Sequence, residues 1–229
     1  MKSVKTYLLL VALAVLASLT VNFTALPILA LGEENVYISE DFEDCALTSY
    51  QGGTGIQSAE KPVSGGRQTV VEENDGKKLS IGISYIYGAA AHDSFIQTSS
   101  PISLYDKLFV SCRIRVEDSS KGNFGLYILG GGDIPAVFIS NGMIRYLGGE
   151  EEEYIDGETF DFSVTVNSVS GEVMVYKDGT LMSYVEDVSK LNENYDLSSI
   201  RVRVRAQVYE GENNVYHLYV DNIIISNRK

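Results

Sequence analysis

The last quarter of the chain contains the pattern that most restricts its fold. Residues Ile200–Val208 alternate apolar and polar side chains without interruption, and an acidic segment rich in Asn follows at residues 210–214. Residues Val215–Ser226 then form a second run dominated by apolar side chains. Alternation with period two, bounded by turn residues, is typical of a strand with one buried face. The two runs therefore predict a hairpin, which must pair with strands that come earlier in the chain.

Short segments of the same kind occur along most of the sequence. Residues Lys107–Val116 alternate cleanly, and Asn141-Gly142 between two apolar runs is a strong hairpin signal because both residues tolerate positive φ. Many short strands separated by regular turns predict an all-β sandwich or barrel, and in a sandwich of two antiparallel sheets every second residue of a strand faces the core. Three boundaries are also expected: a first strand over Val36–Asp44, a loop over Thr48–Gly66 and a helical turn over Val188–Tyr195.

Five segments in a fixed order carry a resemblance to a known fold: Ser39–Asp44, Leu108–Val116, Phe162–Asn167, Gly171–Gly179 and Leu218–Ile223. This order resembles the concanavalin A-like lectin/glucanase jelly roll, including its laminin G-like branch, and is similar to the jelly-roll carbohydrate-binding modules. The resemblance implies a two-sheet antiparallel β-sandwich with a concave sheet that meets a glycan or protein ligand. It also implies a structural calcium ion in many members.

The first 32 residues differ in kind from the rest. Lys2 and Lys5 precede an uncharged run over residues 6–32, which predicts a secretory signal peptide over residues 1–32 and a β-sandwich domain over residues 33–229. An uncleaved membrane anchor is the alternative, because the run is long enough to span a bilayer. Removing the two lysines leaves 16 basic and 31 acidic residues, a net charge of −15. This charge disfavours nucleic acid and anionic membranes as partners, and we expect a secreted or cell-surface protein without stable membrane insertion once the signal is cut.

Three acidic residues are candidates for a calcium site. In the binding modules that the chain resembles, an acid of the first strand and the Asp of the last strand approach the same ion, and the matching residues here are Asp41, Glu43 and Asp221. If the first and last strands pair, these carboxylates come together, and like charges so close require a cation or a proton. The alternative is that all three are solvated or bonded to backbone amides.

Arginines lie in two rows on predicted strands. Arg201, Arg203 and Arg205 share one face, with Tyr209 just beyond them, and Arg113 and Arg115 form a second row. On a concave sheet these residues could bind carboxylates or sulfates of an acidic polysaccharide. The alternative is an outer face on which acids of neighbouring strands pair with the arginines. The chain has 15 Tyr and no Trp, which weakens but does not remove the expectation of aromatic sugar platforms.

No catalytic motif stands out. The acidic cluster at residues 150–158 has the spacing Glu153-x-x-Asp156-x-Glu158, which does not place its acids on one face of a strand as the retaining glucanases of this fold require. Cys45 and Cys112 could form a disulfide outside the cell or remain separate. The sequence thus favours a non-catalytic carbohydrate-binding module. A polysaccharide lyase or glycoside hydrolase, and a structural or adhesion protein of the cell envelope, remain as alternatives.

Overall fold

The structure is a computed structural model that describes residues 36–47, 50, 52–53, 55–60, 67–84, 93–103, 107–209 and 215–227. The chain divides into two units, Met1–Glu34 and Asn35–Lys229, and the described residues belong to the second. The predicted signal peptide lies outside the described residues. Within those residues, no helix is long and apolar enough to cross a membrane.

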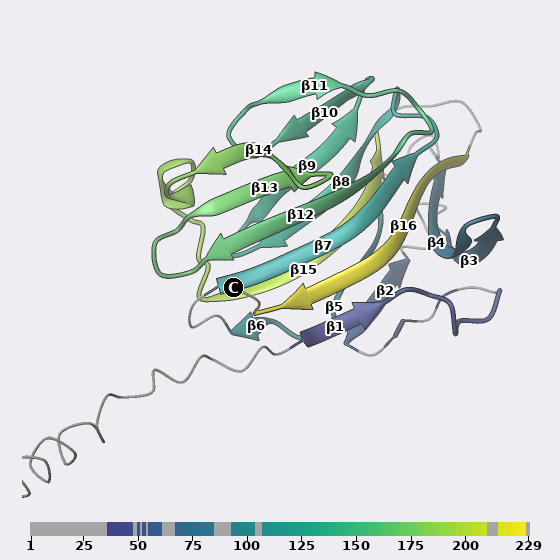
Figure 1. Ribbon diagram of the computed structural model, residues 1–229, viewed down its shortest axis with the longest axis horizontal. Coiled ribbons are helices and arrows are strands. Elements are labelled where there is room, and N and C mark those ends of the chain that lie inside the picture. The colour runs from purple at the N-terminus through teal and green to yellow at the C-terminus, as the bar shows by residue number, and fades with distance from the viewer. Residues whose placement is uncertain are drawn as a thin grey trace, which may run out of the picture. The chain divides into compact units, whose positions relative to one another are not determined.

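Two antiparallel sheets form the body of the second unit (Figure 1). The first sheet has the order β14-β13-β12-β7-β16-β4-β3, and β1 adds to β16. Its strands are β1 (Val36–Glu40), β3 (Arg67–Glu73), β4 (Gly76–Ser84), β7 (Lys107–Val116), β12 (Thr159–Asn167), β13 (Val173–Lys177), β14 (Thr180–Val185) and β16 (Val215–Ser226).

The second sheet has the order β11-β10-β9-β8-β15-β5-β2, and the short β6 pairs with β15. Its strands are β2 (Ile56–Glu60), β5 (Asp93–Thr98), β6 (Ile102–Ser103), β8 (Gly122–Leu129), β9 (Asp133–Ser140), β10 (Met143–Tyr146), β11 (Glu151–Glu153) and β15 (Ser199–Val208). These arrangements confirm the two-sheet antiparallel β-sandwich.

The beginning of the described chain pairs with its end. Strand β1 runs antiparallel to β16, with Ile38 opposite Ile225 and Glu40 opposite Ile223. Figure 1 shows the purple β1 beside the yellow β16. The pairing of the first and last strands, on which the calcium hypothesis depends, is therefore confirmed.

The core follows from the alternation read in the sequence. On β15 the side chains of Ile200, Val202 and Val204 are buried while the arginines between them are only partly so, and β7 repeats this pattern. The apolar faces of the two sheets meet, so water is removed from both at once, which is the main driving force for folding. A single contiguous cluster of buried apolar side chains joins the sheets.

The predicted hairpin of Ile200–Val208 with Val215–Ser226 is wrong, because β15 and β16 lie in different sheets. Strand β15 pairs with β8, β5 and β6, whereas β16 pairs with β7, β4 and β1. Three further local expectations are also corrected. Strand β1 ends at Glu40 because Phe42 adopts a positive φ of 61° and turns its fully buried ring into the core. The expected loop at residues 48–66 contains β2. The expected helical turn over Val188–Tyr195 is a 3-10 helix over Val188–Lys190 alone. Cys45 and Cys112 are both free, which agrees with the alternative in which they remain separate.

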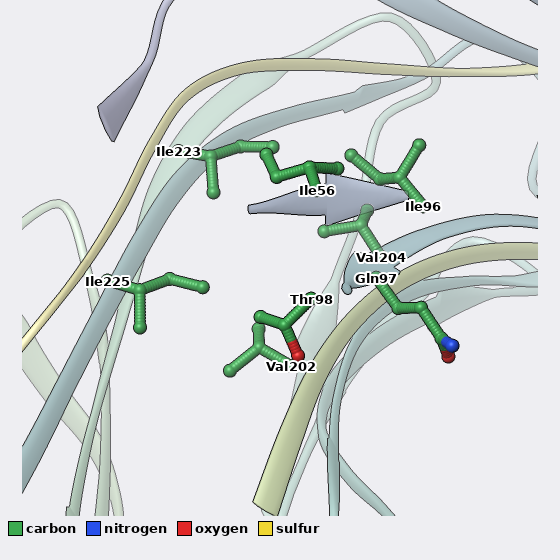
Figure 2. Close-up of a pocket in the computed structure, with 8 residues that line it drawn as sticks. All are labelled: Ile56, Ile96, Gln97, Thr98, Val202, Val204, Ile223 and Ile225. Atoms are coloured by element: carbon green, nitrogen blue, oxygen red, sulfur yellow. The ribbon is translucent and has the colours of Figure 1, made fainter. Parts of the chain in front are cut away.

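A small cavity lies between the sheets (Figure 2). Its volume is about 10 Å³, and side chains of Ile56, Val202 and Ile225 are among those that line it. The buried Thr98 hydroxyl also lines it and has no hydrogen-bond partner among the described residues. Such a volume accommodates at most one water molecule, so this interior space is not a site for a sugar.

Candidate functional site

The outer face of β15 carries the arginine row that the sequence indicates. Arg201, Arg203 and Arg205 alternate with buried apolar residues and point away from the first sheet. Strand β15 lies between β8 and β5 in the interior of the second sheet, so neighbouring strands flank the row on both sides. We call this surface, with Tyr209 at its end, the arginine face.

Side chains of neighbouring strands pair with two of these arginines. Arg205 Nε donates to Asp93 Oδ1 at 2.9 Å, and Arg205 Nη1 donates to Asp133 Oδ2 at 3.2 Å. Arg203 donates from Nε and Nη2 to Gln97 Oε1 at 3.1 and 2.8 Å, and its Nη1 lies 3.7 Å from Asp133 Oδ2. Arg203 and Arg205 therefore follow the alternative given above, in which side chains of neighbouring strands pair with the arginines.

Aromatic rings lie under the same two guanidinium groups. The Arg203 Cζ atom is 4.1 Å from the centroid of Phe95, and the Arg205 Cζ atom is 5.7 Å from that of Tyr127. Cation–π contact at these distances restricts how each guanidinium can turn. Burial lowers the pKa of Arg203, against the opposing effect of Asp133, and burial raises the pKa of Tyr127 to about 12. The phenol is thus neutral at physiological pH.

Tyr209 lies just after β15 at the end of the arginine row. Its side chain is 54% exposed, and its hydroxyl accepts a hydrogen bond from Asn123 Nδ2 at 2.5 Å. The same hydroxyl donates to Gln207 Oε1 at 3.0 Å. The ring is therefore exposed and also fixed in orientation. Burial raises the pKa of Tyr209, so the hydroxyl stays protonated and can both donate and accept.

Arg201 differs from the other two arginines of the row. Within the described part of the chain it makes no hydrogen bond or ion pair, and its guanidinium offers five N–H donors. Among the described residues, three arginines against Asp93 and Asp133 give the face one net positive charge. The Arg201 guanidinium, the fixed Tyr209 and the neighbouring amide side chains can together bind hydroxyl, carboxylate or sulfate oxygens.

The second arginine row lies on the other sheet. Arg113 makes a bidentate pair with Asp161, at 2.9 and 3.2 Å, and Arg115 makes one with Glu73, at 2.9 and 2.6 Å. These residues are on the outer face of the first sheet, whereas β15 is in the second. The two rows therefore do not form one binding surface.

The turn after β1 contains two of the predicted calcium ligands. Asp41 Oδ1 accepts a hydrogen bond from the Glu43 backbone, and Glu43 Oε1 accepts one from the backbone N–H of Lys77 at 2.9 Å. The Lys77 ammonium donates to the carbonyl oxygens of Glu43 and Cys45 at 2.7 and 2.9 Å. The Lys77 ammonium thus already binds the two carbonyl oxygens that this turn could offer to a metal ion.

Asp221 is on β16, near Glu43 but not joined to it. Its oxygens accept hydrogen bonds from the backbone and side-chain nitrogens of Asn222, at 2.8 and 3.2 Å. Burial raises the pKa of Asp221, and the Glu43 carboxylate adds to the rise. In the described part of the chain, no three His, Cys, Asp or Glu side chains are placed to hold a metal ion together. As arranged, Asp41, Glu43 and Asp221 do not fit a calcium ion bound by all three, and structural calcium stays a prediction.

The acids of the 150–158 cluster do not converge. Glu152 forms an ion pair with Lys177, and Asp156 Oδ1 accepts a hydrogen bond from the Ser119 backbone. Glu153 is exposed at the edge strand β11. The structure thus gives this cluster local structural contacts rather than a shared groove.

Comparison with known proteins supports the fold. No protein-family model and no curated protein sequence matches the chain. A solved structure of a sialidase shares 15% identity at a TM-score of 0.61, covering 85% of this chain and 19% of that chain. The cellulose-induced protein Cip1 shares 15% identity at a TM-score of 0.60, covering 83% and 97%. The carbohydrate recognition domain of Emp47p shares 12% identity at a TM-score of 0.57, covering 84% and 96%.

These similarities define the architecture as a concanavalin A-like jelly-roll sandwich, as the order of sequence motifs indicates. The chain spans only about a fifth of the sialidase that it matches. At such low identities the likeness concerns the fold, and function must be argued from the side chains.

Proposed function

We propose that this chain is a non-catalytic carbohydrate-binding module that acts outside the cell or at its surface. Its ligand is a glycan, acidic by preference, and it binds on the arginine face of the second sheet. The supporting observation is the alignment of Arg201, Arg203, Arg205 and Tyr209 along one outer face. Two proteins of similar fold are named for carbohydrate recognition or for a glycan-related activity, the Emp47p domain and the sialidase.

The division of roles follows from the contacts. Arg203 and Arg205 are held by Gln97, Asp93 and Asp133, so they provide a preorganised floor. Arg201 and Tyr209 lie towards the two ends of the row, and we assign the direct ligand contacts to the partly exposed Arg201 and the exposed Tyr209. Preorganised donors lose little conformational freedom on binding, which favours affinity.

A glycan array of the purified chain, run with and without calcium, tests this proposal. We expect binding to uronate- or sulfate-containing glycans that weakens with added salt, because the contacts are ionic. Arg201→Gln should weaken binding about fivefold to tenfold, the effect of one charge-assisted hydrogen bond. Arg113→Gln is the matched control, because it removes an arginine from the outer face of the other sheet and should not change binding.

The same array separates the alternatives. Cleavage of bound polysaccharide would favour a lyase or glycoside hydrolase of this fold. Binding to no glycan at all would overturn the proposal and favour a structural or adhesion role in the cell envelope.

A further inference from the structure

A groove opens between loops at one end of the sandwich, apart from the arginine face. Residues 168–171 between β12 and β13 form one wall, and residues 187–189 and 195–198 between β14 and β15 form the other. Its volume is about 480 Å³. This size is within the range of small-ligand sites, and we call it the loop groove.

Backbone hydrogen bonds fix the walls of the loop groove. Val188 N donates to Gly171 O at 2.8 Å, and Asp196 N donates to Gly130 O at 2.8 Å. Val188 and Leu197 anchor the second wall in the core, since both are buried. A groove with walls tied in this way keeps its shape without a ligand.

Glycine allows the two walls to approach. Gly171 has a φ of +77°, and a Cβ atom there would lie 2.6 Å from Asp187 Oδ1. Both its backbone conformation and its closeness to the opposite wall therefore exclude other residues without a shift of the loop.

The lining combines apolar and hydroxyl-binding groups. Tyr195 packs partly against the core, and Val169 is 79% exposed at the rim. Four serine side chains and two carboxylates, those of Asp187 and Asp196, complete the lining. None of the described lining residues is Lys or Arg. Such a site disfavours anionic ligands and suits a neutral, hydroxyl-rich one.

Hydrogen bonds within the loops orient the carboxylates of Asp187 and Asp196. Asp187 Oδ1 accepts hydrogen bonds from the Ser189 backbone and hydroxyl at 3.0 and 2.7 Å, and Asp196 Oδ1 accepts one from the Ser198 backbone at 2.9 Å. An ionised carboxylate has about four lone-pair sites, so each keeps capacity for ligand hydroxyls. Vicinal hydroxyls of a sugar are suitable donors, and its C–H face can pack on a tyrosine ring.

We propose that the loop groove binds a neutral sugar unit, independently of the arginine face. Asp187 and Asp196 accept hydrogen bonds from its hydroxyls, while Tyr195 and Val169 contact its apolar face. The site is distinct from that of the proposed function, so either can fail while the other stands.

Isothermal titration of the full chain with hexasaccharides of cellulose, xylan and mannan tests this site. We expect at least one to bind, and Val169→Arg and Asp196→Asn each to weaken that binding about tenfold, by obstruction and by loss of a charged acceptor. Val169 is exposed and Asn keeps the Oδ1 acceptor, so both variants should fold. Asp118→Asn is the matched control, because Asp118 accepts the same kind of hydrogen bond from the Ser120 backbone outside the groove.

The proposal is overturned if no hexasaccharide of the panel binds at millimolar concentration, or if the dissociation constants of both groove variants equal that of the wild type. Arg201→Gln should leave neutral binding unchanged, and Val169→Arg should leave acidic-glycan binding unchanged. A loss of neutral binding in Arg201→Gln would place that ligand on the arginine face and also count against the groove.

Discussion

The arginine face and the loop groove hold their charged side chains in different ways. On the face, guanidinium groups are fixed by acids and an amide from other strands, such as Asp93 and Gln97 on β5. In the groove, carboxylates are fixed by backbone N–H groups two residues further along the same loop. The first arrangement depends on sheet register and the second on local turn chemistry. The two regions should therefore respond differently to mutation, and they present opposite charges to a ligand.

Removing the acid beneath Arg205 should have the largest effect. Asp93 and Arg205 have side chains only 8% and 14% exposed, so Asp93→Ala leaves a guanidinium buried without its nearest acid. We expect a loss of about 3 kcal/mol in the free energy of unfolding, measured with chemical denaturant. Asp133→Ala is the control, with a 48% exposed carboxylate and an expected loss below about 1 kcal/mol. Equal losses would contradict the division between buried and exposed partners.

A glycine pair tests how tightly the groove walls are joined. Gly171 and Gly179 both have a φ of +77°, but only at Gly171 would a Cβ meet an opposing side chain. Gly179→Ala should cost about 1 kcal/mol for the left-handed backbone alone. Gly171→Ala should cost about 1 kcal/mol more, because Asp187 must move. If both variants lose the same free energy of unfolding, Asp187 moves freely and the two walls of the groove are not tightly joined.

The turn after β1 provides a third case, in which backbone carbonyl groups of a loop hold the ammonium group of Lys77. Lys77→Met removes the ammonium that binds the carbonyls of Glu43 and Cys45, and we expect a loss of about 1 to 2 kcal/mol. Lys190→Met should change stability little, since its ion pair with Glu186 is exposed. If structural calcium is bound, excess EDTA should lower the melting temperature of the wild type, added Ca²⁺ should reverse the fall, and Asp221→Ala should abolish it. An unchanged melting temperature would contradict structural calcium.

A smaller effect is expected in the pH dependence of stability, because the ion pair of Glu73 with Arg115 is lost when the Glu73 carboxylate is protonated. The hydrogen bond from Arg115 lowers the pKa of Glu73, and Lys78 contributes to the shift. Because the folded pKa is below the unfolded one, this stabilisation is complete above about pH 5 and is lost as pH falls through the folded pKa. Between pH 6 and pH 3 the melting temperature of Glu73→Gln should therefore fall less than that of the wild type. An identical fall would show that the pair contributes nothing.

The sequence predicts those parts of the structure that depend on periodicity. Strict alternation at Ile200–Val208 and Lys107–Val116 correctly gives the strands and their outward arginines. The pairing of first and last strands follows from the order of motifs and is also confirmed. These features are local in sequence or shared by the whole class of fold, which is why they can be read in advance.

Other features depend on neighbours that a sequence pattern does not identify. Asp93 and Asp133 reach Arg205 only because β5 and β9 lie near β15 in the sheet, so their roles are not visible in their own segments. The end of β1 depends on the positive φ of Phe42, a conformation that aromatic residues rarely adopt. No pattern in the sequence indicates the role of Lys77, which depends on the carbonyl groups of Glu43 and Cys45.

The most direct test of carbohydrate binding on the arginine face is to map backbone amide shifts by NMR during titration with a galacturonic acid oligosaccharide. We predict that the shifts concentrate on β15, the outer faces of β8 and β5, and Tyr209, and that Arg201→Gln reduces them. Shifts confined to the first sheet, or no shifts at millimolar ligand, would contradict the account.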